Sequence, residues 1–187
     1  MEKNYNKYDI LIYILIISLS CGDVFGAISP IRVLTILFSP LVFGKLNKTT
    51  YKYARPILLL FIFWFVWIMF SMLWTFDKSE GGKSIIYYFI HFLLFIEIII
   101  FSHNARQPLK AIVLGWITAF VSTSFVALWE LNTNMHLNVA RFDSDRTVEI
   151  GGVRVFHKFA SATFYNYNTY VTFICYSISF ILVFIYD

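Results

Sequence analysis

The chain has 187 residues, of which 59% are hydrophobic, 20% are aromatic and only 14% are charged. Soluble domains carry roughly 25% charged residues, so this composition excludes an ordinary soluble domain and indicates a membrane protein. The formal net charge of +4 is modest and no basic run stands in a soluble context, so we expect no nucleic-acid partner.

The first apolar run covers residues 10–28 and is long enough to cross a bilayer, which takes about 20 residues. More apolar sequence follows Ser29-Pro30-Ile31-Arg32, so we interpret the run as a retained helix rather than a cleaved signal peptide. The second run, 31–44, is short and contains Pro40, which predicts a kinked or partly embedded helix. Pro30 is able to begin it, because proline suits the first helical position.

The next two runs are joined by a short polar turn at 77–84. The run at 56–76 is uncharged and ends with Trp74, which suits the membrane interface. The run at 85–101 contains His91 and Glu97, six positions apart, so on a helix they point about 120° away from each other. An ionisable group inside a membrane is a functional candidate, but an inward-facing structural role for Glu97 is an equal alternative.

These runs, with two more near the end of the chain, predict an all-α polytopic membrane protein with six transmembrane helices and one long outer loop. We expect a single membrane domain over residues 1–187. The expected spans are 10–28, 31–44, 56–76, 85–101, 111–129 and 168–186, and the expected outer loop is 131–165.

The distribution of Lys and Arg predicts that both termini lie inside the cell. Segments 1–9, 45–55 and 102–110 together hold eight of the fifteen cations within twenty-nine residues, and 45–55 contains no acid. Cytoplasmic loops carry the excess of positive charge, so these three segments are expected to be cytoplasmic. The loop 131–165 is then outside.

The outer loop contains a hairpin signal around Gly151-Gly152. Alternating β-branched residues flank the two glycines, which can both take positive φ values. In that register Glu149 faces Arg154 and Ile150 faces Val153. A cross-strand ion pair is one explanation for Arg154, and a ligand role is the other.

Four cations make this loop a candidate anion site at a membrane surface, because a phosphate is the first anion met there. They are Arg141, Arg146, Arg154 and Lys158. Arginine suits bidentate phosphate binding better than lysine does. The alternative is a solvated loop whose arginines are neutralised by Asp143 and Asp145. No His, Cys, Asp or Glu cluster has the spacing of a metal site, so no metal is expected.

Two motifs on either side of the loop resemble the O-antigen polymerase and O-antigen ligase superfamily. The first reads Glu130-x-x-Thr133-x-x-His136-Leu137, and the second reads Thr163-Phe-Tyr-Asn166-Tyr-Asn168-Thr-Tyr170. Members of that family show a Glu-x-x-Thr-Gly-x-His-Leu pattern and then a Gly-Thr-Phe-x-Asn-Pro-Asn segment that opens the next helix. This chain departs from the pattern at Asn134, Ala162 and Tyr167. The motif positions are therefore Glu130, His136, Asn166 and Asn168.

The resemblance implies a multi-pass glycosyltransferase of the bacterial inner membrane that needs neither metal nor other cofactor. Such enzymes transfer glycan from an undecaprenyl diphosphate carrier at the periplasmic face, and arginines hold the diphosphate. Membrane lipid, the carrier-linked oligosaccharide and other polysaccharide-assembly proteins are the implied partners. Family members are longer, so we expect this chain to be the N-terminal part of such a protein and inactive alone, with its catalytic residues unassigned.

Two other classes of function remain open on the sequence alone. One is a transporter subunit that uses Glu97 and His91, although most arginines lie outside the spans rather than at mid-membrane. The other is a non-catalytic membrane scaffold, which the short chain permits.

Overall fold

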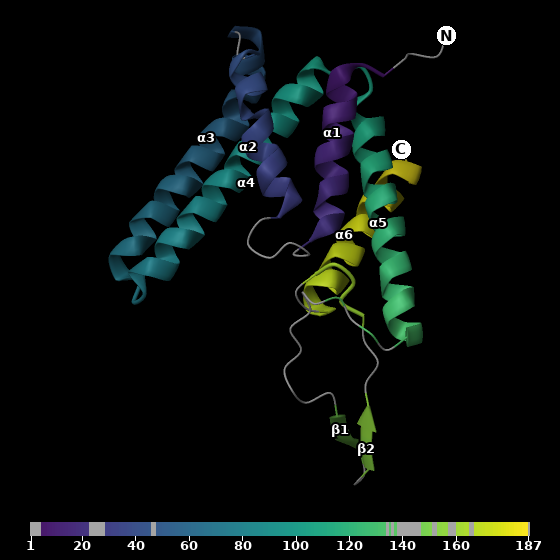
Figure 1. Ribbon diagram of the computed structural model, residues 1–187. Coiled ribbons are helices and arrows are strands. Elements are labelled where there is room, and N and C mark those ends of the chain that lie inside the picture. The colour runs from purple at the N-terminus through teal and green to yellow at the C-terminus, as the bar shows by residue number, and fades with distance from the viewer. Residues whose placement is uncertain are drawn as a thin grey trace. The chain divides into compact units, whose positions relative to one another are not determined.

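The computed structural model describes most of the chain and contains six α-helices and two strands in that part (Figure 1). The described residues are 5–22, 29–45, 48–133, 135, 137, 147–150, 153–156, 160–164 and 167–186. In chain order the elements are α1 Lys7–Ser18, the 3₁₀ turn η1 Leu19–Cys21, α2 Pro30–Phe43, α3 Lys48–Ser71, the 3₁₀ turn η2 Met72–Trp74, α4 Lys78–Asn104, α5 Pro108–Thr133, β1 Thr147–Ile150, β2 Val153–Phe156 and α6 Tyr167–Tyr186.

Three of these helices are long and apolar enough to cross a membrane: Tyr51–Trp74, Gly81–Asn104 and Pro108–Thr133. The chain is therefore a helical membrane protein. α2 and α6 contribute shorter apolar helices, at Pro30–Phe43 and Asn168–Leu182. The number of crossings and the identity of the membrane stay predictions.

The first helix differs most from its expected range of 10–28. It begins at Lys7, and its regular part ends at Ser18, followed by η1 and then Gly22 with φ +48°. Residues 23–28 lie outside the described residues. The apolar sequence continues past Ser18, but the regular helix does not, because the chain turns at Gly22.

The central helices extend beyond the apolar runs that predicted them. α3 begins at Lys48 rather than at 56, and α4 runs from Lys78 to Asn104 rather than over 85–101. A helix needs only its backbone hydrogen bonds to continue, so it passes through polar residues where hydropathy no longer marks it. α2 begins at Pro30 and contains Pro40.

The chain divides into two compact units. Unit 1 comprises residues 1–12 and 32–109, and unit 2 comprises 13–31 and 110–187. The two units are described separately below.

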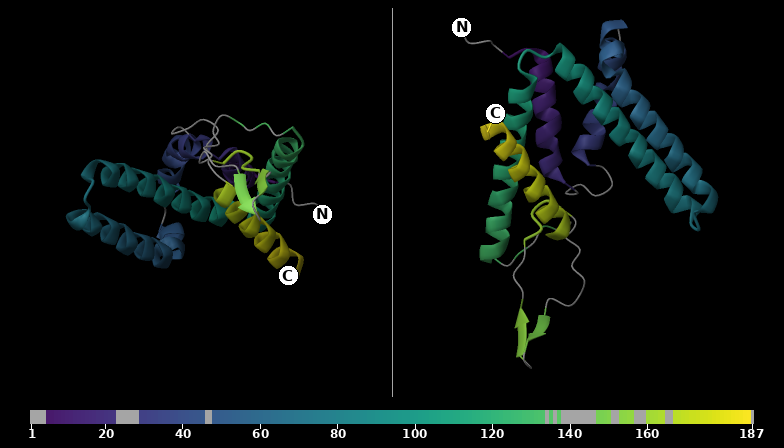
Figure 2. Two further views of the ribbon diagram at one scale, coloured as in Figure 1. Left: turned by 90° about the horizontal axis from the view of Figure 1, so that it is seen from below. Right: turned by 180° about the vertical axis from the view of Figure 1, so that it is seen from behind.

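In unit 1, α3 and α4 pack side by side as an antiparallel helical hairpin (Figures 1 and 2). Phe61 of α3 lies against Phe95 and Phe92 of α4, with ring centroids 4.7 and 5.9 Å apart. One turn further along, Phe65 lies 5.9 Å from Phe89. Aromatic pairs of this kind contribute about 0.5–1.5 kcal/mol each beyond their area burial. These three pairs therefore fix the position of α3 along α4.

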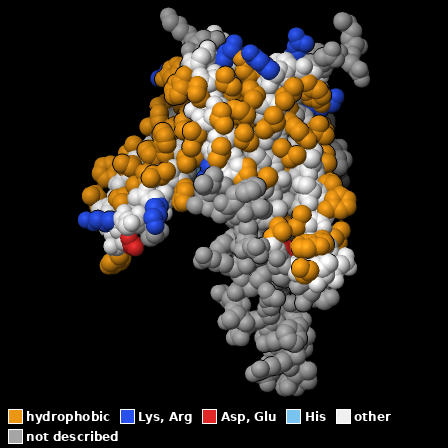
Figure 3. Space-filling model, viewed as in Figure 1, with side chains coloured by type: hydrophobic (Ala, Val, Ile, Leu, Met, Phe, Trp, Pro, Cys, Tyr) orange, Lys and Arg blue, Asp and Glu red, His pale blue; other side chains and the backbone are white. Residues whose placement is uncertain are grey.

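The outer surface of this hairpin is apolar. Leu60, Phe63 and Trp67 of α3 are exposed, by 67%, 73% and 60%. Figure 3 shows hydrophobic side chains along the helices and Lys and Arg gathered toward the helix ends. Such a surface suits contact with lipid, where an apolar band is flanked by charged ends.

Also in unit 1, the start of α1 is hydrogen bonded to the connection between α4 and α5. The Asp9 carboxylate is 1% exposed and accepts hydrogen bonds from the backbone N–H groups of Gln107 at 2.7 Å and Arg106 at 3.3 Å. The Asn6 side-chain amide donates to the Asn104 carbonyl oxygen at 3.0 Å. Tyr53, near the start of α3, stacks on His103. The described parts of segments 1–9, 45–55 and 102–107 therefore lie close together within unit 1.

In unit 2, α5 packs against α6 and against the second half of α1. Trp116 of α5 stacks on Phe180 of α6 at a centroid distance of 5.4 Å and lies tilted against Phe173 at 5.6 Å. On the α1 side, Gly115 permits close approach, because a Cβ there would lie 2.8 Å from the Cβ of Ile16. A core of small and aromatic side chains results, which includes Ala119, Ala127, Ala162, Phe164 and Phe173.

The two strands pair in antiparallel fashion. The Cα register places Glu149 opposite Arg154 and Ile150 opposite Val153. This is the register expected from the Gly-Gly pattern, although Gly151 and Gly152 themselves lie outside the described residues. The location of the strands on the outer side of a membrane stays a prediction.

Candidate functional site

A buried, hydrogen-bonded polar site in unit 2 joins the end of α5 to the segment before α6. We call it the loop anchor, and it comprises Gly22, Glu130 and residues 160–164. The Glu130 carboxylate is 1% exposed and lies in the last turn of α5. Its Oε2 accepts hydrogen bonds from the backbone N–H groups of Ser161 at 2.8 Å and Ala162 at 2.7 Å, while Oε1 lies 3.4 Å from the Ser161 hydroxyl.

The backbone of the loop anchor is shaped to present those N–H groups. Ala162 takes φ +50°, the left-handed conformation that costs an alanine roughly 1–2 kcal/mol. The N–H of Phe164 donates to the Ser161 carbonyl oxygen at 2.9 Å and closes the turn. Successive N–H groups in such a turn make a concave site for an anion, and here the Glu130 carboxylate fills it.

The turn after η1 supports the same segment from the other side. The Thr163 hydroxyl donates to the Ser20 carbonyl oxygen at 2.5 Å. Gly22 packs directly on Thr163, since a Cβ at position 22 would lie 2.4 Å from the Thr163 carbonyl oxygen. Thr163 thus connects the first helix of the chain to the segment that opens the last one.

Aromatic side chains pack around Phe164 of the loop anchor. The Phe164 ring lies 5.0 Å from Phe173 and 6.0 Å from Tyr170. All three are buried. Because its surroundings are packed and its acceptors are engaged, Glu130 positions backbone rather than offering a free carboxylate for catalysis.

The remaining sequence-predicted residues are distributed as follows. Asn168 lies in the first turn of α6, is exposed, and its carbonyl oxygen accepts a hydrogen bond from the Thr172 hydroxyl. Arg154 lies in β2, opposite Glu149. His136, Arg141, Arg146, Lys158 and Asn166 lie outside the described residues, so their roles stay predictions.

The two ionisable groups on α4 occupy different surroundings, as their spacing predicts. His91 is exposed, and its Nδ1 lies 2.6 Å from the Tyr87 carbonyl oxygen of the preceding turn. Glu97 is 1% exposed, and neither of its oxygens has a hydrogen-bond partner among the described residues. They do not form an acid–base pair.

Sequence reasoning identified Glu130 but missed its partners. Ser20, Gly22 and Ser161 carry no distinguishing signal, because their contributions are a carbonyl oxygen, a missing side chain and a backbone N–H group.

No protein-family model, curated protein or solved structure matches this chain.

Proposed function

We propose that the chain is part of a polysaccharide polymerase or ligase, a membrane glycosyltransferase that acts on glycans linked to undecaprenyl diphosphate. It works at the periplasmic face of a bacterial inner membrane. The observation that carries the proposal is the hydrogen bonding between Glu130 and the N–H groups of Ser161 and Ala162. It joins the first resembled motif to the start of the second.

The loop anchor gives the long loop two fixed ends. Glu130 lies in the last turn of α5, and residues 160–164 lead into α6, so the intervening segment begins and returns at the same place. That segment carries Arg141, Arg146, Arg154 and Lys158. Because both ends of the loop are held at its base, we expect its cations to reach the membrane surface, where a carrier head group lies.

The reaction needs what such a loop supplies. The bond between the sugar anomeric carbon and the carrier phosphate oxygen breaks, and the diphosphate leaves with the electron pair. A bond forms to an acceptor hydroxyl oxygen, whose proton passes to a general base. Fixed guanidinium groups around the leaving diphosphate stabilise the charge that develops on it, which is the largest contribution in many transferases.

Carrier binding tests the proposal directly. We expect Arg141 and Arg146 to be the principal contacts and Arg154 and Lys158 to assist. A charge-assisted contact contributes about 1.5–3 kcal/mol, so each Arg→Ala change at 141 or 146 should weaken binding of an undecaprenyl diphosphate analogue roughly ten- to a hundredfold. Arg→Lys should also weaken it where the contact is bidentate.

The measurement uses the detergent-solubilised full chain, with Lys52→Ala as the control because Lys52 is an exposed cation of unit 1, outside the loop. Unchanged affinity in both Arg141→Ala and Arg146→Ala would overturn the assignment. It would leave the loop cations as solvated surface.

Glu97 favours a second candidate function, that of a transporter subunit. It is a buried carboxyl group in a spanning helix, with no hydrogen-bond partner for its oxygens among the described residues. Such groups mark proton and ion pathways in membrane proteins. Proton flux into proteoliposomes that is lost in Glu97→Gln and kept in His91→Gln would support this candidate, whereas equal flux in Glu97→Gln would exclude it.

A further inference from the structure

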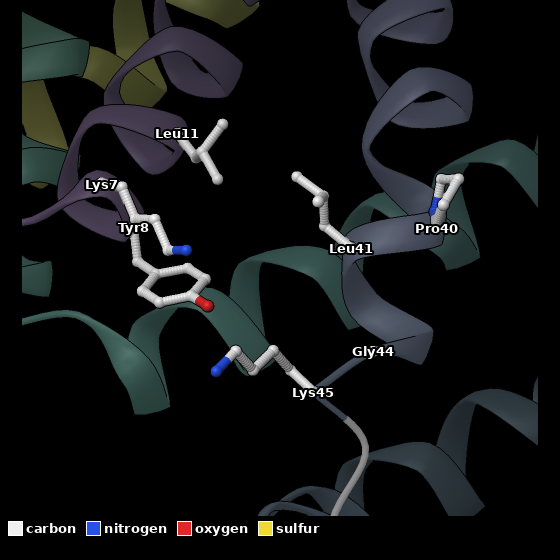
Figure 4. A pocket seen from close by; sticks show the side chains of 7 residues that line it. All are labelled: Lys7, Tyr8, Leu11, Pro40, Leu41, Gly44 and Lys45. Atoms are coloured by element: carbon white, nitrogen blue, oxygen red, sulfur yellow. The ribbon is translucent and has the colours of Figure 1, made fainter.

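Unit 1 contains a pocket of about 230 Å³ between the beginning of α1 and the end of α2 (Figure 4). α1 contributes Lys7, Tyr8 and Leu11, and α2 with the turn after it contributes Pro40, Leu41, Gly44 and Lys45. That turn is closed by backbone hydrogen bonds, from Gly44 to the Pro40 carbonyl oxygen and from Lys45 to that of Val42. The turn thereby holds Lys45 at the pocket wall opposite Lys7.

Two ammonium groups converge on one aromatic ring in this pocket. Nζ of Lys7 lies 5.3 Å from the centroid of the Tyr8 ring, and Nζ of Lys45 lies 5.8 Å from it. Figure 4 shows both side chains beside the ring, Lys7 from α1 and Lys45 from the turn after α2. Tyr8 is itself fixed, being 9% exposed and 5.9 Å from the ring of Phe101.

No carboxylate among the described residues forms an ion pair with either lysine. Asp9 is next to the pocket in sequence, but it is 1% exposed and its oxygens accept the backbone N–H groups of Asn6, Arg106 and Gln107. Two like charges held on one ring repel each other, and the ring quadrupole offsets only part of this. An anion between them would relieve the repulsion.

The rest of the pocket lining is apolar, and exposed apolar side chains lie next to it along α1 and α2. Leu11, Pro40 and Leu41 form this apolar part, and Leu41 is 48% exposed. Ile10 and Phe43, which flank the pocket along α1 and α2, are exposed by 52% and 69%. A ligand that fits both parts has an anionic head and an apolar body.

We propose that this pocket binds the phosphate head group of an anionic membrane phospholipid, with Lys7 and Lys45 on the phosphate and Leu11, Pro40 and Leu41 against the glycerol and upper acyl chain. Basic pockets between membrane helices on the cytoplasmic side hold such head groups. The topology expected from the sequence places this end of α1 and α2 in the inner leaflet. The inference is independent of the proposed function, because none of its residues belongs to the outer loop or the loop anchor.

The experiment is native mass spectrometry of the full chain in a non-ionic detergent, titrated with phosphatidylglycerol. We expect one retained lipid, and roughly ten- to a hundredfold weaker retention in the double variant Lys7→Gln/Lys45→Gln. The double variant Lys7→Arg/Lys45→Arg should stay within about threefold of the wild type, since it keeps both charges. Phosphatidylcholine, which has no net charge, should not be retained.

Lys52→Gln is the matched control, because Lys52 is an exposed lysine of α3 that does not line the pocket. An equal loss in Lys52→Gln would show a general surface attraction and overturn the site. Displacement of the lipid by millimolar glycerol 1-phosphate or inorganic phosphate would show a site for soluble phosphate and overturn the lipid assignment. Retention of phosphatidylglycerol in Lys7→Gln/Lys45→Gln at wild-type affinity would overturn the role of the lysines.

Discussion

At the scale of single residues, two buried carboxylates perform the same task in different units. Asp9 accepts N–H groups from residues 106 and 107, just before α5, and Glu130 accepts those of 161 and 162, just before α6. A buried backbone donor without a partner costs about 1–3 kcal/mol, and a carboxylate satisfies two such donors at once. Each acid therefore fixes the start of a helix that lies far from it in sequence.

Replacing Glu130 tests this task. Glu130→Gln removes the charge, and its one amide oxygen takes the place of Oε2, which accepts both backbone N–H groups, while its NH₂ group faces the Ser161 hydroxyl. Charge-assisted hydrogen bonds become neutral ones, so we expect a loss of about 1–2 kcal/mol in the free energy of unfolding. Thermal or denaturant unfolding of the purified chain measures it. Asn132→Ala, an exposed position on the same helix end, should change stability by less than about 0.5 kcal/mol. Equal stability of Glu130→Gln and the wild type would contradict the loop anchor.

Glycine at position 22 is required by both its conformation and its contacts. Gly22→Ala places a Cβ 2.4 Å from the Thr163 carbonyl oxygen at a φ of +48°, so we expect a loss of several kcal/mol, on the scale of an overpacked core site. Gly82→Ala is the control, because no atom lies within 4 Å of a Cβ there. It lies inside α4, where alanine is the better helix former, so it should stabilise by about 0.5–1 kcal/mol. The two midpoints of thermal unfolding should move in opposite directions.

At the scale of elements, α1 is organised by the cap at its beginning. The Asn6 side-chain oxygen accepts the N–H groups of Tyr8 and Asp9, at 2.9 and 3.1 Å, and the Asp9 carboxylate accepts the N–H of Asn6 at 2.7 Å. This reciprocal pattern is a capping box in which aspartate stands in place of glutamate. Because Asp9 also holds the α4–α5 connection, the cap joins two distant parts of unit 1.

Hydrogen exchange separates the local role of this cap from the distant one. In Asp9→Ala the amides of Arg106 and Gln107 lose their acceptor, so we expect their exchange to accelerate roughly tenfold or more. Asp77→Ala removes the acceptor of the Ser79 N–H at the start of α4 and should leave exchange at 106 and 107 unchanged. Equal protection of both amides in Asp9→Ala would refute the connection.

At the scale of the whole molecule, the expected sidedness follows from charge. Segments 1–9, 45–55 and 102–110 carry the cation excess, and contacts within unit 1 bring the described parts of the first two together with 102–107. The α3–α4 turn lies at the far end of the helical hairpin (Figure 1). We therefore expect one crossing of a membrane to separate Thr49 from Ser79.

Cysteine labelling of intact cells tests this topology. In a background with Cys21 and Cys175 changed to alanine, a membrane-impermeant maleimide should label Ser79→Cys and Ser144→Cys but not Thr49→Cys. Thr49→Cys should react only after the cells are permeabilised. The reverse pattern would invert the topology and move the long loop to the cytoplasm.

The sequence by itself determined the membrane class, the three long helices and the pairing of the strands. Hydrophobic runs at 56–76, 85–101 and 111–129 become α3, α4 and α5 because a bilayer leaves backbone groups no partner other than their own helix. The strand register follows from alternation around Gly151-Gly152, a pattern that is local in the chain. The sequence also identified Glu130 as a motif residue.

Only the tertiary structure decided where the first helix ends and what Glu130 does. The first helix ends before Gly22, which packs on Thr163, and the Glu130 carboxylate accepts a hydrogen bond from a backbone N–H group 31 residues away. The pocket of Lys7 and Lys45 likewise joins the beginning of α1 to the end of α2 and the turn after it, which are distant in sequence. Hydropathy and spacing describe neighbours along the chain, whereas these contacts join backbone atoms and side chains from distant segments. Their partners are therefore fixed only when the helices pack.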